Sequence, residues 1–144
     1  YLAGHILCII ALLPTLIYLV SIYLLGQPQG NLDFGATWGS YIGLVFLSGV
    51  YVSIGIFTSS LSENQIVSFL MSLFLCFFCF YGFDQIASFF SWTGLELFIQ
   101  NLGINAHYNS ISRGVIDSRD ITYFISFIGL LIIGTKLSIQ IRKW

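Results

Sequence analysis

Long segments without charged residues constrain the fold of this chain more than any other feature of its sequence. From Leu2 to Leu25 there is no Asp, Glu, Lys or Arg. This apolar segment is longer than the ~20 residues that an α-helix needs to cross the hydrocarbon of a bilayer. Three further apolar segments follow, at about 37–60, 65–83 and 121–140. The sequence therefore predicts an all-α, polytopic membrane helix bundle with four crossings.

The composition agrees with a membrane protein. Hydrophobic residues make up 57% of the 144 residues and charged residues 8%, and the mean hydropathy is +0.91. A soluble domain needs roughly 25% charged residues to solvate its surface. The net charge of -1 and the five Lys plus Arg provide no basic stretch that could neutralise several phosphates, so we expect no nucleic-acid binding.

Pro14 lies in the middle of the first apolar segment. Proline lacks a backbone N–H and clashes with the preceding turn, so we expect a kink near Ile10, with the Thr15 hydroxyl satisfying a freed carbonyl. Such a kink is either a hinge of a transporter or a proline that the membrane helix tolerates. The loop from Gly26 to Gly35 predicts that its two flanking helices are antiparallel neighbours.

Small residues recur at helical spacing in the second apolar segment. Gly39 and Gly43 form a G-x-x-x-G motif, and Gly49 and Ser53 form a second small-x-x-x-small pair. Each pair lies on one helix face and lets another backbone approach closely. These four residues are therefore candidates for helix packing, against either a helix of the same chain or a helix of a partner.

Three cysteines lie inside apolar segments, and two of them, Cys76 and Cys79, form a C-x-x-C motif. A tetrahedral metal site would need a second pair of cysteines or histidines nearby, and the flanking residues are Phe and Leu. We interpret the cysteines as small apolar side chains of a buried helix. No metal site, catalytic site or cofactor is predicted.

A short polar turn separates the second and third apolar segments. Ser62 followed by Gln65 fits a capping box for the third helix, which would place Glu63 in the first turn of that helix. Glu63 is the one acidic residue in this turn.

The chain becomes more polar after Gly82. Asp84 and Glu96 occur among many aromatic residues, and we expect short re-entrant or interfacial helices in a region at about 84–119. Carboxylates at membrane depth are candidates for function. The alternative is that both carboxylates lie above the hydrocarbon, in water.

The stretch from His107 to Asp120, which we call the polar elbow, concentrates charge just before the last apolar segment. Gly114 is a candidate break between a short helix and the final helix. Asp120 is a candidate N-cap of that final helix, with Asp117 and Ser118 as alternatives. We also expect ion pairs inside the elbow, between the arginines Arg113 and Arg119 and the aspartates Asp117 and Asp120.

The positive charges near the C-terminus predict the orientation in the membrane. Lys136, Arg142 and Lys143 favour a cytoplasmic C-terminus. Four crossings would then place Tyr1 in the cytoplasm and the polar elbow outside. Arg113 and Arg119 lie in that outer elbow, so they reduce the difference in positive charge between the two sides on which this orientation rests.

Several segments, in order along nearly the whole chain, resemble a known family of permeases. The family is the GldF-like branch of ABC-2 permeases, the membrane subunit of a gliding-motility-associated ABC transporter. The polar elbow is the most specific of the matching segments. All of them are Ala11 to Leu16, Gly39 to Leu44, Phe57 to Val67, Phe74 to Phe78 and His107 to Asp120.

The resemblance implies a subunit with six crossings, in the bacterial inner membrane, of which this chain holds the last four. Because the sequence starts at Tyr1, without Met or a signal-peptide pattern, we expect it to be a fragment of a longer protein. The family pairs two permease subunits, as a homodimer or heterodimer, with a separate ABC ATPase. Short re-entrant helices precede its last crossing.

ATP hydrolysis is expected on the partner, because the sequence has no G-x-x-x-x-G-K-[ST] motif. In an exporter, Glu63 would be a minor cytoplasmic contact with the ATPase. Residues that would gate or hold the outer mouth are Asp84, Glu96, His107, Arg113, Asp117, Arg119 and Asp120.

A different class of function also fits the sequence. A non-transporting membrane scaffold for a cell-envelope machine would need only the small-residue faces for assembly. An intramembrane enzyme is disfavoured, because the sequence has no H-E-x-x-H motif. The transported substrate, whether lipid, polysaccharide or peptide, is left open.

Overall fold

The computed structural model describes residues 1–26, 32–92 and 94–142, and this part of the chain is helical and has no β-strand. The elements are α1 (Leu2–Leu12), α2 (Thr15–Leu25), α3 (Phe34–Leu61), α4 (Gln65–Phe77), the π-helical turn η1 (Phe78–Gly82), α5 (Phe83–Phe89), α6 (Glu96–Gln100), α7 (Ile104–Ser112) and α8 (Ser118–Arg142).

Four helical stretches, which we call the four crossings, are long and apolar enough to cross a membrane, which confirms the predicted all-helical class with four candidate membrane-spanning helices. They are Leu2–Leu25, Phe34–Leu61, Gln65–Phe89 and Ser118–Arg142. The second crossing begins earlier than predicted because Asp33 caps α3, its Oδ1 accepting from the Ala36 N–H at 3.1 Å.

Pro14 divides the first crossing into α1 and α2. Because proline has no N–H, the Ile10 carbonyl loses its usual partner, and it accepts instead from the Leu13 N–H at 3.2 Å. The Thr15 hydroxyl donates to the Leu12 carbonyl, as the sequence led us to expect. The break itself lies between Leu12 and Thr15, slightly later than the predicted kink.

The third crossing continues past its predicted end. α4 passes through η1 into α5 without a break in the helix, so the crossing ends at Phe89 rather than near residue 83. The sequence change at Gly82 coincides with the last residue of the π-helical turn. Such turns often interrupt α-helices at functional sites.

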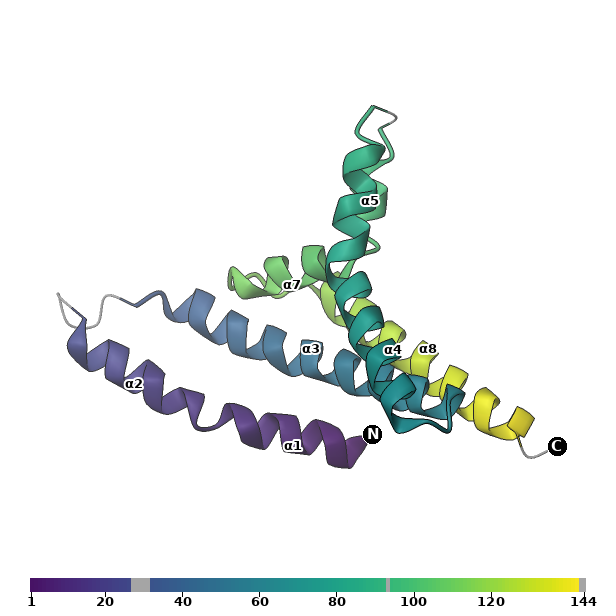
Figure 1. Ribbon diagram of the computed structural model, residues 1–144. Helices are drawn as coiled ribbons and strands as arrows, with labels where there is room; N and C mark the ends of the chain where they lie inside the picture. The colour runs from purple at the N-terminus through teal and green to yellow at the C-terminus, as the bar shows by residue number, and fades with distance from the viewer. Residues whose placement is uncertain (27–31, 93, 143–144) are drawn as a thin grey trace.

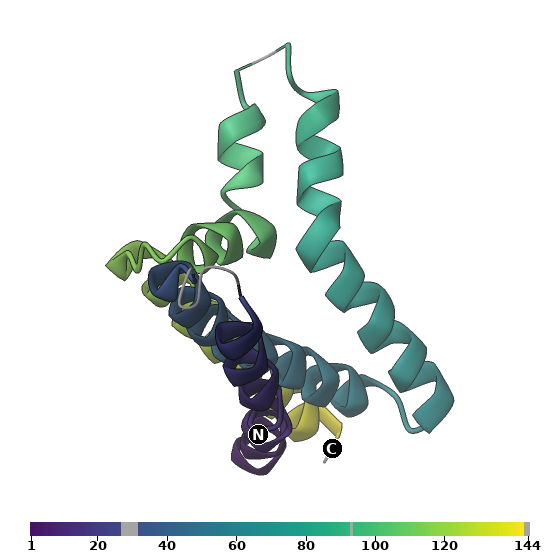
Figure 2. The same cartoon turned by 90° about the vertical axis from the view of Figure 1, so that its left-hand side faces the viewer.

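α3 is the central helix of the molecule, packing against α1, α4, α7 and α8. Figures 1 and 2 show α1 and α2 running beside α3, and both termini at the same end. A hairpin formed by α5 and α6 stands away from this bundle, and α7 leads from the hairpin back to the beginning of α8 (Figures 1 and 2).

A small core holds the helices together. It is formed by fully buried side chains of α3, α7 and α8 that include Ile54, Ile111 and Phe124, and Phe46 stacks on Phe124 with ring centroids 5.7 Å apart. Most other large apolar side chains are exposed, on the hairpin as well as on the crossings. Exposure of this extent is typical of helices that are covered by lipid.

Two sequence predictions fall partly outside the described residues. The expected loop from Gly26 to Gly35 includes residues 27–31, and Lys143 of the expected cationic tail is also among the residues that the structure does not describe.

Candidate functional site

The polar elbow is a sharp reversal between α7 and α8. α7 ends at Ser112, and Gly114 follows with φ of +86°, which L side chains rarely adopt. A Cβ on Gly114 would also lie 2.7 Å from the carbonyl carbon of Gly35. Glycine is therefore required here both by the backbone conformation and by the close approach of the α3 N-terminus.

A histidine and an aspartate form an ion pair at the base of the elbow. His107 of α7 faces Asp120 in the first turn of α8, with Nδ1 and Oδ1 2.6 Å apart. The other ring nitrogen, Nε2, lies 2.8 Å from the Asn101 carbonyl oxygen. A carbonyl can only accept, so Nε2 carries a proton.

Tyr123 completes this cluster. Its ring stacks on His107 with centroids 3.9 Å apart, and its hydroxyl donates to the Leu102 carbonyl at 2.6 Å. Asp120 is only 6% exposed, and its second oxygen, Oδ2, is buried and finds no hydrogen-bond partner among the described residues. The His107–Asp120–Tyr123 cluster thus fixes α8 to α7 and to the turn that precedes α7.

The structure corrects the predicted helix cap. Asp117, one of the alternatives, caps α8 by accepting from the Arg119 N–H at 3.0 Å. Asp120 lies inside the first turn and is turned toward His107, so it cannot serve as the N-cap.

The predicted ion pairs of the two arginines are wrong. Within the described ranges the structure has one ion pair, His107–Asp120, and neither Arg113 nor Arg119 reaches Asp117 or Asp120. The reason is that Asp117 is occupied by the cap and Asp120 points into the protein. Both arginines are exposed.

A polar cleft of about 810 Å³ lies where the hairpin meets α7. Asp84 of α5 accepts a hydrogen bond from the Asn105 side-chain amide, and Asn109 donates to the Asn105 Oδ1 at 3.0 Å. The residues that line this polar cleft are Asp84, Leu97, Gln100, Asn101, Asn105, Ala106, Asn109, Ser110, Arg113 and Val115. Asp84 and Arg113, two predicted site residues, are thus brought to one place.

Glu96 contacts a residue of the polar cleft, Gln100, but does not itself line the cleft. It lies at the beginning of α6 and accepts from the Gln100 side chain at 3.3 Å, within its own short helix. The structure does not bring Glu96 into the polar cleft.

The G-x-x-x-G motif lies directly beneath the elbow. A Cβ on Gly39 would be 2.3 Å from the Ile111 carbonyl oxygen, and a Cβ on Gly43 would be 3.1 Å from the Tyr108 ring. Both glycines therefore face α7 of the same chain, and their lack of side chains lets α3 support the elbow.

The second small pair packs against other helices of the chain. A Cβ on Gly49 would lie 2.9 Å from the Tyr1 hydroxyl and 3.1 Å from Ile128. Ser53 is buried, and its hydroxyl donates back to the Gly49 carbonyl at 2.8 Å. This part of α3 thus approaches both the chain start and α8.

The turn before α4 is capped differently from the sequence prediction. Asn64, rather than Ser62, is the N-cap, and its Oδ1 accepts from the Ile66 N–H at 3.0 Å. Ser62 instead accepts from the Asn64 N–H at 3.2 Å, which shapes the turn. Glu63 is therefore outside α4, exposed in the turn.

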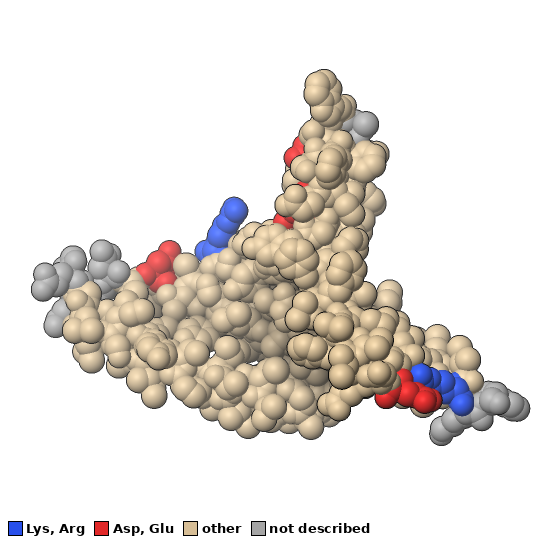
Figure 3. Space-filling model, viewed as in Figure 1, with Lys and Arg blue, Asp and Glu red and all other residues tan. Residues whose placement is uncertain are grey.

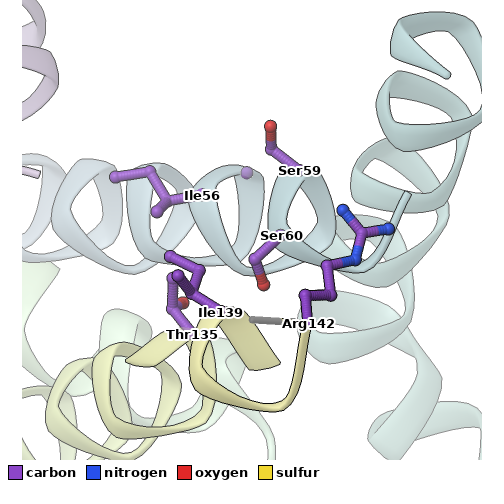
Figure 4. Close-up of a pocket in the computed structure, with 7 residues that line it drawn as sticks. Ile56, Ser59, Ser60, Thr135, Ile139 and Arg142 are labelled. Atoms are coloured by element: carbon purple, nitrogen blue, oxygen red, sulfur yellow. The ribbon is translucent and has the colours of Figure 1, made fainter. Parts of the chain in front are cut away.

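A second pocket, of about 670 Å³, lies at this same end of the molecule, between α3 and α8 (Figure 4). Its lining residues are Gly55, Ile56, Ser59, Ser60, Thr135, Ile139 and Arg142. Arg142 donates to the Leu61 carbonyl at 3.0 Å, which ties the end of α8 to the end of α3. The sequence alone does not predict this pocket, and the small residues at 55, 59 and 60 are the signal that it offers.

The cysteines do not assemble into a metal site. Cys79 is buried in η1, Cys76 is half-buried in α4, and in the described ranges no three His, Cys, Asp or Glu side chains come together.

Comparisons with protein-family models, with curated proteins and with solved structures find no match for this chain. The class that the structure supports is therefore an all-helical chain with four helices able to cross a membrane.

Proposed function

We propose that this chain is the transmembrane permease subunit of an ATP-driven exporter of the ABC-2 type, in a bacterial inner membrane. The observation that carries the proposal is the order of elements from α5, the end of the third crossing, to the last crossing. A helical hairpin of α5 and α6 and the short α7 precede the last crossing. The resemblance of the sequence to ABC-2 permeases implies short re-entrant helices at this same position.

In this proposal the chain supplies the pathway and a partner supplies the energy. The sequence has no phosphate-binding loop, so ATP would bind and be hydrolysed on a separate ABC ATPase. Closure of the ATPase would rock the crossings of two permease subunits between inward-open and outward-open packings. An association with gliding motility or with cell-envelope export rests on the resemblance alone.

The polar elbow would hold the outer mouth of the pathway. His107 and Asp120 connect α7 to the last crossing, and Asp84 connects the hairpin to α7 through Asn105. A movement of the last crossing would therefore be transmitted to the hairpin through these polar contacts. Four other charged residues would act at the same mouth. Glu96 would act from the hairpin, and the exposed side chains of Arg113, Asp117 and Arg119 would act from the elbow.

The turn at Glu63 would face the ATPase. Glu63 is exposed between α3 and α4, at the end of the molecule where Arg142 contacts Leu61. Figure 3 shows acidic and basic side chains side by side at this end. We expect Glu63→Lys to weaken association with the ATPase, and undiminished association would remove Glu63 from the contact.

A membrane scaffold is the second candidate. The close packing at Gly39, Gly43 and Gly49 would serve a static assembly as well as a moving one. A scaffold, however, needs no ATPase.

Co-purification tests the proposal. The full-length chain would be tagged, extracted in several mild detergents and analysed for an ABC ATPase that is retained with it. Retention of such an ATPase is the expected result. If no ATPase is retained in any of the detergents, the scaffold becomes the better account.

A further inference from the structure

The polar cleft between the hairpin and α7 is lined by several amide and charged side chains, whereas packing of helices against one another needs only apolar or small side chains. Asn105, Asn109 and Arg113 recur every four residues, so they lie along one face of α7 and its C-terminal turn. Asn109 and Arg113 are exposed there. The volume of about 810 Å³ lies in the range of roughly 300–1,000 Å³ that is typical of sites for small ligands.

The charges in the cleft are separated along its length. Asp84 lies beside Asn105, and its carboxylate accepts a hydrogen bond from the Asn105 side-chain amide. Arg113 lies two helical turns further on, and within the part of the chain that the structure describes it has no ion-pair partner. A rise of 1.5 Å per residue places the backbones of Asn105 and Arg113 about 12 Å apart. Figure 3 shows acidic side chains on the hairpin and a basic side chain projecting beside it.

These side chains match one kind of ligand. Amides donate and accept hydrogen bonds, as hydroxyl groups do, and a carboxylate accepts from hydroxyl groups. A guanidinium binds phosphate through two parallel hydrogen bonds. We propose that the polar cleft binds a phosphorylated polyol, with the phosphate on Arg113 and the hydroxyl groups on Asn109, Asn105 and Asp84.

Other occupants fit the lining less well. A metal ion would need several carboxylates or histidines, whereas the cleft is lined by a single carboxylate, Asp84. A purely apolar ligand would displace water from the exposed side chains of Asn109 and Arg113 without replacing its hydrogen bonds. The phosphorylated polyol has two possible sources, a membrane lipid headgroup and a soluble sugar phosphate. The proposal concerns binding alone, so it does not depend on the presence of an ATPase.

Binding can be measured on the full chain in nanodiscs of phosphatidylcholine. The lipid probe is phosphatidylinositol, counted on the protein by native mass spectrometry, and the soluble probe is inositol 1-phosphate, detected by saturation-transfer NMR. Arg113→Gln should weaken binding of the active probe at least tenfold. Arg119→Gln is the matched control, because Arg119 is an exposed arginine of the same elbow that does not line the cleft.

The outcomes separate the source from the site. Binding of phosphatidylinositol alone would assign a lipid headgroup, and binding of inositol 1-phosphate would assign a soluble ligand. Each result supports the proposed site if Arg113→Gln weakens the binding and Arg119→Gln does not. Equal weakening by Arg119→Gln would reduce the effect to general attraction of anions and overturn the proposal, as would absence of binding to both probes. If Arg113→Gln fails to fold, Asn109→Ala replaces it, with a several-fold loss expected.

Discussion

His107 is the residue on which the polar elbow depends most. Both of its ring nitrogens face acceptors, the Asp120 carboxylate and the Asn101 carbonyl, while Tyr123 covers its ring. A buried carboxylate is tolerated when it is paired and hydrogen-bonded, and becomes costly when the partner is removed. The His107–Asp120 pair is therefore better understood as a coupled unit than as two separate contributions to stability.

A double-mutant cycle tests this coupling. His107→Phe should destabilise the protein by about 3–5 kcal/mol, because it leaves the Asp120 carboxylate buried without a partner. Asp120→Leu should cost less, about 1–3 kcal/mol, since it leaves only a polar ring nitrogen unpaired. The double variant should be clearly more stable than the sum of the two effects predicts. Thermal unfolding in detergent measures all three, and strictly additive losses would show that the pair is not coupled.

At the scale of the elements, the contact between α3 and α7 determines where the elbow lies. The Gly39 Cα faces backbone atoms of Ile111 and Gly114, which cannot rotate away as a side chain would. Gly129, in the middle of α8, offers a comparison, since a Cβ there would meet no atom of the described chain within 4 Å.

Alanine substitutions at these two glycines should have opposite effects. Gly39→Ala should destabilise the chain by about 1–3 kcal/mol, because α3 and α7 must move apart to admit the methyl group. Gly129→Ala should be neutral or stabilising by up to about 1 kcal/mol, as expected for alanine in a helix. The temperature at which each variant loses its monodisperse peak in size-exclusion chromatography gives the comparison. Equal behaviour of the two variants would contradict the close packing at Gly39.

The same elements show how far the sequence alone could predict the structure. The four crossings were predictable because each requires only a long apolar segment, and Pro14 marked the break in the first crossing through its missing N–H. The partner of Asp120 was not predictable. The sequence placed four charged residues close together, but only the fold decides that His107 faces Asp120 while the arginines point outward. The polar cleft was not predictable for the same reason, because its lining residues come together only when the α5–α6 hairpin packs beside α7.

For the whole molecule, the two ends are distinct. The elbow meets the start of α3 at one end, where Gly114 approaches Gly35. The other end holds the turn at Glu63, the end of α8 and both termini (Figure 1). If the long helices cross a membrane, these two groups of residues must lie in different compartments.

Cysteine labelling checks this arrangement. In a background without Cys8, Cys76 and Cys79, a membrane-impermeant maleimide should label Arg119→Cys in intact cells. It should label Glu63→Cys only after the cells are permeabilised, because both positions are exposed but lie at opposite ends. Labelling of both positions in intact cells, or the reverse pattern, would contradict the proposed orientation.

Coupling between this chain and an ATPase can be measured on the purified proteins. The full-length permease and the ATPase that co-purifies with it would be reconstituted in liposomes, and ATP hydrolysis would be measured with and without the permease. We expect the hydrolysis rate to change when the permease is present, and we expect Asp120→Asn, once its folding has been checked by size-exclusion chromatography, to alter this change. If the hydrolysis rate is the same with and without the permease, the chain is not coupled to this ATPase and the proposed function is wrong.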